Sequence, residues 1–180
     1  MTDLSLELTY ISWQELLLRV GLAMVVGLVL GLERDSKNKP IDFRAYMIVA
    51  VTTCVLAILG QEIYSDFSSA ENIVKVDLSS IISGVMTGIG FLGAGAIIQR
   101  GDRVVGTATG ASIWASGGIG LTIGFGFYAL GIVAFGAISL ILLAGGLCRA
   151  WMSGVDDSEK CAQENNNQEN GDPKKDAQEK

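Results

Sequence analysis

The sequence is short of the residues from which most catalytic and metal sites are built. Its 180 residues include no histidine, two prolines and three cysteines. Without an imidazole, the chain cannot form a Ser-His or Cys-His nucleophile, a histidine metal site or a histidine pH switch. Cys54, Cys148 and Cys161 have no metal-ligand spacing, and we interpret them as small hydrophobic residues. We therefore expect no catalytic residues, no bound metal and no cofactor.

Positive charge is also scarce. The formal net charge is −6, and residues 150–180 contribute −4 of it through eight acidic and four basic residues. The rest of the chain is close to neutral and has no basic surface. Nucleic acid is therefore not expected as a partner.

Apolar residues and glycine, in contrast, are abundant. Hydrophobic residues make up 49% of the chain, and there are 23 glycines. The stretch from Leu78 to Ile98 contains no charge and no proline. As a helix it would span about 30 Å, the thickness of the hydrocarbon core of a bilayer. Its glycines would weaken a helix in water, but in lipid they allow neighbouring helices to approach closely. This stretch is predicted to be a transmembrane helix.

Similar apolar runs predict an all-α membrane protein, a polytopic bundle of about five transmembrane helices. The expected spans are about residues 13–32, 45–63, 78–98, 104–123 and 127–147, within a transmembrane domain of residues 13–149. Basic residues gather in the connections 33–44 and 99–103, which the positive-inside rule places on the cytoplasmic side. The amino-terminal segment, residues 1–12, is then expected to be external.

The last 31 residues have a different composition. From Ala150 to Lys180 the chain is acidic and has few large apolar residues. Such a segment buries too little surface to offset the entropy lost on ordering. We predict a disordered cytoplasmic tail.

Two charged residues fall inside the first predicted span. Glu15 and Arg19 are four residues apart, so they lie on one face of a helix and can form an ion pair. Both are close enough to the end of the span to reach the headgroup region. We interpret the pair as structural, with a functional intramembrane charge as the alternative.

Small residues are concentrated in the third and fourth predicted spans. Gly88, Gly90 and Gly93 match the Gly-x-Gly-x-x-Gly pattern of dinucleotide-binding proteins. That motif needs a preceding strand and a soluble helix, whereas this copy lies inside an uncharged span, so we do not expect a nucleotide. We interpret the glycines as surfaces for close helix packing; they are Gly88, Gly90, Gly93, Gly95, Gly106, Gly110 and Gly117.

A polar cluster is expected where the first span ends and the second begins. It consists of Glu33, Arg34, Asp35 and Arg44. In the simpler interpretation these are loop charges that set topology and cap helices. In the other they form an ion-paired network at the cytoplasmic end of the bundle, where they face a partner or an ion.

Three stretches of this sequence resemble a known family. They are VVGLVLGLERD (25–35), FRAYMIVAV (43–51) and SGVMTGIGFLGAGAIIQRGDRVVGTATGASIWASGGIGLTIGFGFY (83–128). With the five-span layout, they resemble the MgtC/SapB family of bacterial inner-membrane proteins. The similarity extends from about Gln14 to Leu143, and residues 88–114 are its most specific part.

The resemblance implies a function and a set of residues. It implies action on other membrane proteins, such as the F-type ATP synthase, during magnesium limitation, stress or intracellular survival. It also implies that Glu33, Arg34, Asp35 and Arg44 are functional, although Asp35 stands where glutamate is usual.

The chain also departs from the family pattern. Ala45 stands where a hydroxyl residue is common, and Ala108 where threonine is commoner. Longer relatives carry a folded cytoplasmic domain of the ACT type, so the expectation here is a short member that lacks this domain.

Three functional classes follow from the sequence. The first is a non-enzymatic multi-pass inner-membrane protein whose partners are the lipid bilayer and other membrane proteins or a second copy of itself. The alternative is a Mg²⁺ transporter or channel, because two adjacent glycine-interrupted spans can line a site, although no charge lies at mid-membrane. A purely structural assembly protein is the third class.

Overall fold

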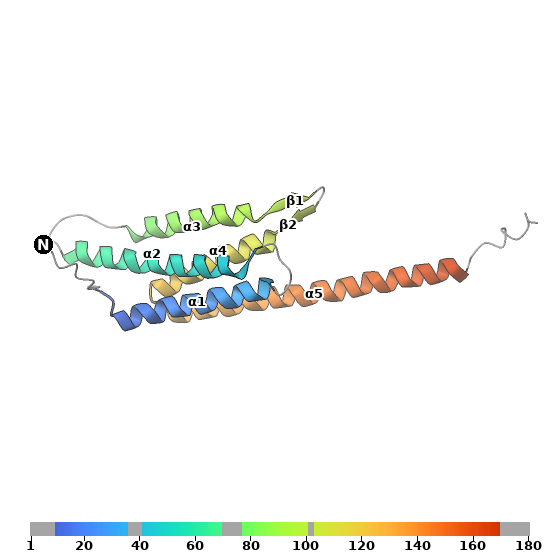
Figure 1. Ribbon diagram of the computed structural model, residues 1–180, viewed down its shortest axis with the longest axis horizontal. Helices are drawn as coiled ribbons and strands as arrows, with labels where there is room; N and C mark the ends of the chain where they lie inside the picture. The colour runs from blue at the N-terminus through green and yellow to red at the C-terminus, as the bar shows by residue number, and fades with distance from the viewer. Residues whose placement is uncertain (1–9, 36–40, 70–76, 101–102, 170–180) are drawn as a thin grey trace, which may run out of the picture. The chain divides into compact units, whose positions relative to one another are not determined.

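The computed structural model describes residues 10–35, 41–69, 77–100 and 103–169, and side chains as far as Cys148. The predicted external segment, residues 1–12, lies mostly outside these ranges. Five helices and one short hairpin follow in order (Figure 1). They are α1 (Trp13–Asp35), α2 (Phe43–Ser69), α3 (Leu78–Gly95), β1 (Ile98–Arg100), β2 (Arg103–Val105), α4 (Thr107–Gly124) and α5 (Tyr128–Glu169). The helical membrane fold expected from the sequence is confirmed.

Three of the helices begin at a side-chain cap. Glu15 N–H donates to Ser12 Oγ at the start of α1, and Arg44 N–H donates to Asp42 Oδ1 at the start of α2. Asp77 caps α3 by accepting from Ser79 N–H. Such caps satisfy backbone donors that have no partner within the helix, and they explain why these helices start where they do.

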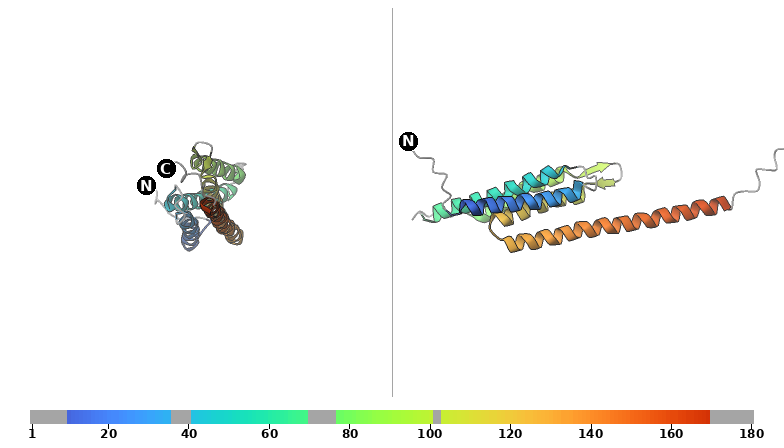
Figure 2. Two further views of the ribbon diagram at one scale, coloured as in Figure 1. Left: turned by 90° about the vertical axis from the view of Figure 1, so that its right-hand side faces the viewer. Right: turned by 60° about the horizontal axis from the view of Figure 1, so that its bottom comes forward.

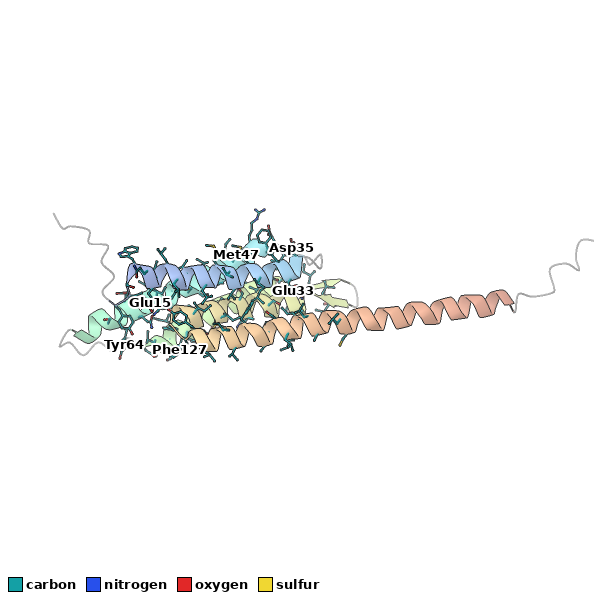
Figure 3. All side chains as sticks on the ribbon, turned by 90° about the horizontal axis from the view of Figure 1, so that it is seen from below. Glu15, Glu33, Asp35, Met47, Tyr64 and Phe127 are labelled. Atoms are coloured by element: carbon teal, nitrogen blue, oxygen red, sulfur yellow. The ribbon has the colours of Figure 1, made fainter. Side chains whose placement is uncertain are left out.

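Helices α1 to α4 run in alternating directions (Figure 1), and α4 contacts α1, α2 and α3. The bundle therefore has two ends. We call one the Arg34 end, where α1 and α3 finish and α2 and α4 begin. The other is the Arg19 end, where α1 and α3 begin and α2 and α4 finish. Figure 3 shows Glu33 and Asp35 at the first end and Glu15 at the second.

Four of the helices are long and apolar enough to cross a membrane, with windows at Trp13–Asp35, Phe43–Ser65, Leu78–Gly95 and Tyr128–Cys148. Helix α4 is rich in Gly, Ala, Ser and Thr, and it falls outside this set. More than half of its residues are buried against the neighbouring helices. Because α4 faces protein more than lipid, it does not need the apolar surface that a lipid-facing helix needs.

The connection between α3 and α4 differs from the predicted basic turn. Helix α3 ends at Gly95, and the chain then forms an antiparallel hairpin in which Ile98 pairs with Val105 and Arg100 with Arg103. The hairpin projects beyond the ends of α1 and α2 (Figure 2). Gly106 connects β2 to α4; its φ is +91° and an added Cβ would overlap the carbonyl of Ala96, so only glycine fits.

The chain divides into two units, residues 1–138 and 139–180, and α5 crosses the boundary. The backbone of residues 150–169 continues α5, where the sequence predicts disorder. This stretch contains no proline, but it has one glycine, three asparagines, two aspartates and two serines, which are weak helix formers. The disordered tail stays a prediction. Residues 170–180 lie outside the described ranges.

Candidate functional site

The predicted polar cluster divides when it is placed on the fold. Glu33, Arg34 and Asp35 form the last turn of α1, and Arg44 is the second residue of α2. Arg34 is only 5% exposed, whereas Asp35 and Arg44 are exposed. One member of the predicted cluster is thus inside the bundle, and two are at its surface.

Arg34 reaches from α1 to α4. Its Nη2 donates to Thr109 Oγ1 over 3.2 Å, and its Nη1 lies 4.0 Å from Glu33 Oε2. Thr109, the third residue of α4, is almost fully buried. Burying a guanidinium is costly unless its charge and its donors are matched. The 4.0 Å between Arg34 Nη1 and Glu33 Oε2 is longer than a hydrogen bond, so this ion pair compensates the buried charge of Arg34 only weakly.

Tyr46 completes this region from α2. The residue is fully buried, and its carbonyl accepts from Ser116 Oγ of α4 over 2.9 Å. Its hydroxyl lies close to the Arg34 side chain, with which it interacts without the geometry of a full hydrogen bond, and within electrostatic range of Glu33. Among the described residues, neither the Tyr46 hydroxyl nor Arg34 Nε has a hydrogen-bond partner. The Arg34 end therefore contains two buried donors that are not used.

Arg44 lies apart from this region. Its side chain is 74% exposed, and its Nε lies 3.2 Å from Asp42 Oδ2. Its guanidinium also lies over the Phe43 ring, 5.9 Å from the centroid. Among the described residues, Arg44 therefore forms its ion pair with Asp42, which caps its own helix, and not with Glu33 or Asp35.

A second polar cluster, at the Arg19 end, is larger than the sequence suggested. Arg19 is 5% exposed and forms the predicted ion pair with Glu15. Its Nη1 also donates to Gln61 Oε1 over 2.8 Å and to the carbonyl of Gly124 over 2.6 Å. Its Nε donates to the hydroxyl of Tyr128 over 3.1 Å. One guanidinium thus connects α1, α2, α4 and α5.

The turn that follows α4 is shaped around this arginine. Gly126 has φ of +83°, and an added Cβ would lie 3.0 Å from Arg19 Nη2. Gln61 Nε2 donates to the carbonyl of Phe125 in the same turn over 3.1 Å. These contacts could not be predicted from the sequence, because the partner residues lie 42 to 109 positions from Arg19 and share no motif with it.

The glycines that were predicted to pack helices fall into two groups. Gly93 and Gly110 face each other, and a Cβ on Gly110 would overlap the Gly93 carbonyl. A Cβ on Gly117 would overlap the side chain of Ile89, and Gly106 is held at the hairpin as described above. Around Gly88, Gly90 and Gly95, in contrast, an added Cβ would meet nothing within 4 Å in this chain.

Other glycines make comparably close contacts. Gly27 and Gly31 of α1 pack directly on the backbone of α2. Gly120 and Gly124 of α4 pack on the carbonyls of Ala50 and Cys54. Their spacing of four residues in each helix is the pattern of small residues that allows close helix packing.

No group of three or more His, Cys, Asp or Glu side chains that could hold a metal ion occurs within the described ranges. Glu33 and Asp35 flank Arg34 in the sequence, and the positive charge of Arg34 offsets part of theirs. The described geometry at this end therefore suits hydrogen-bond donation better than cation coordination.

Comparison with known proteins gives matches over most of the chain. The profile of the MgtC family matches residues 20–149. Protein SapB of Bacillus subtilis is 35% identical over 138 residues, which cover 74% of this chain and 58% of SapB. The putative magnesium transporter YhiD of Escherichia coli is 33% identical over 129 residues, 72% of this chain and 59% of that protein.

Protein MgtC of Salmonella typhimurium is 32% identical over 127 residues, which cover 71% of this chain and 49% of MgtC. The matched part thus spans between half and three fifths of the length of these relatives. No solved structure matches. The profile covers most of the chain, from within α1 to within α5, and the relatives match more than two thirds of it, so the chain belongs to the MgtC family of membrane proteins.

Proposed function

We propose that this protein binds other membrane proteins within the bilayer and modulates them, without catalysis, during adaptation to low magnesium, stress or intracellular survival. We place it in the bacterial inner membrane, with the Arg34 end and the carboxyl terminus on the cytoplasmic side. The F-type ATP synthase is a partner of the expected kind. The observation that carries the proposal is an exposed face of α3.

This face, which we call the α3 open face, consists of small and hydroxyl residues around one aromatic ring. At 3.6 residues per turn its members share one side of the helix, and each of them is exposed. The face contains Ser80, Ser83, Gly84, Thr87, Gly88, Phe91, Ala94 and Gly95. An added Cβ at any of its three glycines would meet nothing within 4 Å. Phe91 is 80% exposed.

Helix α5 shows what a lipid-facing surface looks like in the same chain. Its exposed large side chains are almost all branched aliphatic ones, among them Leu130, Ile132, Val133, Leu140 and Ile141. Glycine and serine on a helix surface contribute little to burial in lipid and weaken the helix, but they let a second helix approach closely. The composition of the α3 open face therefore favours a protein neighbour over lipid.

Site-specific photo-crosslinking in living cells tests this proposal. A photoreactive amino acid at Gly88 is expected to capture a specific membrane protein under magnesium limitation, and the same amino acid at Val133 of α5 serves as the lipid-facing control. Gly84→Leu with Gly88→Leu is expected to insert normally, to lose the crosslink and to lose support of growth in low magnesium. Equal crosslinking from both positions, or full growth with the double variant, would contradict the proposal.

The transporter class remains the second hypothesis because the relative YhiD is named as a putative magnesium transporter. A magnesium flux assay with the purified protein in liposomes separates the two. We expect no flux above that of empty liposomes. Flux that depends on the protein would replace partner binding by transport as the primary function.

A further inference from the structure

Two buried arginines occur in the described bundle, and one of them has unused donors. Arg34 Nε and the Tyr46 hydroxyl have no hydrogen-bond partner among the described residues, although Arg34 is 5% exposed and Tyr46 is fully buried. Leaving such groups unpaired inside a protein is destabilising, because they lose their hydrogen bonds to water without replacement. Buried unpaired donors in a native fold call for a specific explanation, and a bound acceptor is one.

The start of α4 adds further donors at the same place. Arg34 Nη2 donates to Thr109 Oγ1, which places the guanidinium at the first turn of α4. The helix begins after Gly106, and no side chain caps it. The first backbone N–H groups of a helix have no partner within it, and the helix dipole makes this end positive. Arginine and a helix amino terminus together are a common basis for anion binding.

The charge of Arg34 is only loosely balanced. The distance of 4.0 Å between Arg34 Nη1 and Glu33 Oε2 is that of an ion pair without a hydrogen bond. Asp35 is exposed, and the described ion pair of Asp42 is with Arg44. An incoming anion could therefore take the place of Glu33 as the closest counter-ion of Arg34, at the cost of moving that carboxylate outward.

We propose that the Arg34 site, made of Arg34, Tyr46, Thr109 and the first turn of α4, binds a phosphate group. Donors from three helices need an acceptor with several oxygens, and phosphate has this geometry. The site lies one residue from the end of α1, at the start of α2 and α4, which is the depth of lipid headgroups. The phosphate comes from a lipid headgroup or from free inorganic phosphate. The proposal gives the polar cluster a ligand and is independent of the α3 open face.

The test uses the full chain purified in a maltoside detergent, which contains no phosphate. In one arm, inorganic phosphate is added and compared with chloride at the same ionic strength. In the other, phosphatidylglycerol is added and compared with a neutral diacylglycerol. Thermal unfolding and native mass spectrometry are the measurements. We expect stabilisation in at least one arm, and the arm that responds identifies the source of the phosphate.

Tyr46→Phe is the informative variant, because it removes only the unused hydroxyl. We expect its melting temperature without phosphate to equal or exceed that of the wild type and its dissociation constant for phosphate to rise about tenfold. Arg34→Lys, which keeps the charge but lacks Nε, should weaken binding by a similar factor. Tyr128→Phe is the matched control: its hydroxyl is bonded to Arg19, so it should lower the melting temperature and leave phosphate binding unchanged.

Two outcomes would overturn the assignment. The first is the absence of a phosphate-specific response in both arms. The second is a response that is equal in the wild type, Tyr46→Phe and Arg34→Lys, which would show that any binding is elsewhere. Crosslinking from Gly88 in the Tyr46→Phe background separates this result from the proposed function, because the α3 open face does not include the Arg34 site.

Discussion

Arg19 and Arg34 are buried to the same extent, but they differ in how many hydrogen bonds their guanidinium groups donate. Arg19 donates to a carboxylate, an amide, a carbonyl and a hydroxyl, and these groups come from four helices. Arg34 has one described hydrogen bond, to Thr109, and a loose ion pair with Glu33. A buried guanidinium whose three nitrogens all donate hydrogen bonds holds a structure together, whereas one with a nitrogen that makes none can still bind a ligand. The comparison supports a structural role for the Arg19 end and is consistent with the phosphate binding proposed for the Arg34 end.

The largest effect is expected from replacing the two arginines by methionine. Arg19→Met removes the contact between four helices and leaves buried acceptors unpaired, so it should lower the free energy of unfolding by about 3 kcal/mol or more. Arg34→Met loses one hydrogen bond and should cost about 1 kcal/mol. Denaturant or thermal unfolding in detergent measures both. Equal losses of unfolding free energy in the two variants would contradict the different roles inferred for the two ends.

An intermediate effect on stability is expected from replacing glycines, which compares a packed helix surface with an exposed one. Gly120→Ala places a methyl group against the Ala50 carbonyl and should lower the stability of the purified protein by about 1–3 kcal/mol through overpacking. Gly88→Ala on the α3 open face meets no atom and should leave stability unchanged or raise it by up to about 1 kcal/mol. Thermal unfolding of both variants is the measurement. A loss with Gly88→Ala would show that its face is already packed.

The smallest effect is expected at Asp77, which caps α3 at the Arg19 end. Hydrogen bonds from Ser79 and then from Ser80 hold the pKa of the Asp77 carboxyl below its ordinary value. Because the pKa is lower in the folded state, the stabilisation is present above the pKa of the unfolded chain. It is lost as the pH falls through the folded-state pKa. Asp77→Ala should therefore be less stable than the wild type at pH 7, and the gap should close in strong acid. A gap independent of pH would exclude the carboxylate as its cause.

Much of the fold could be predicted from apolar runs and charges. Trp13–Asp35 and Leu78–Gly95 form helices close to their predicted limits, because lipid-length apolar sequences have few other stable structures. The hairpin at Ile98–Val105 was missed, since its strands have only three residues each and lie within a glycine-rich sequence without alternation.

The sites were harder to predict for a different reason. The pairing of Glu15 with Arg19 follows from a spacing of four residues, but Gln61 and Tyr128 are brought to Arg19 only by the folded bundle. Likewise, Gly88 and Gly93 look alike in the sequence. Tertiary contacts alone distinguish the glycine that packs on Gly110 from the one that is open.

The composition of α4 also has a consequence for how the protein is made. A segment rich in glycine, serine and threonine has little tendency to partition into a bilayer by itself, so the insertion machinery would not retain it as a single span. The short hairpin of Ile98–Arg100 and Arg103–Val105 ties α4 to the preceding α3, which is apolar enough to be retained. We expect the two to enter the membrane as one helical pair. The hairpin between α3 and α4 would then determine that α4 inserts together with α3.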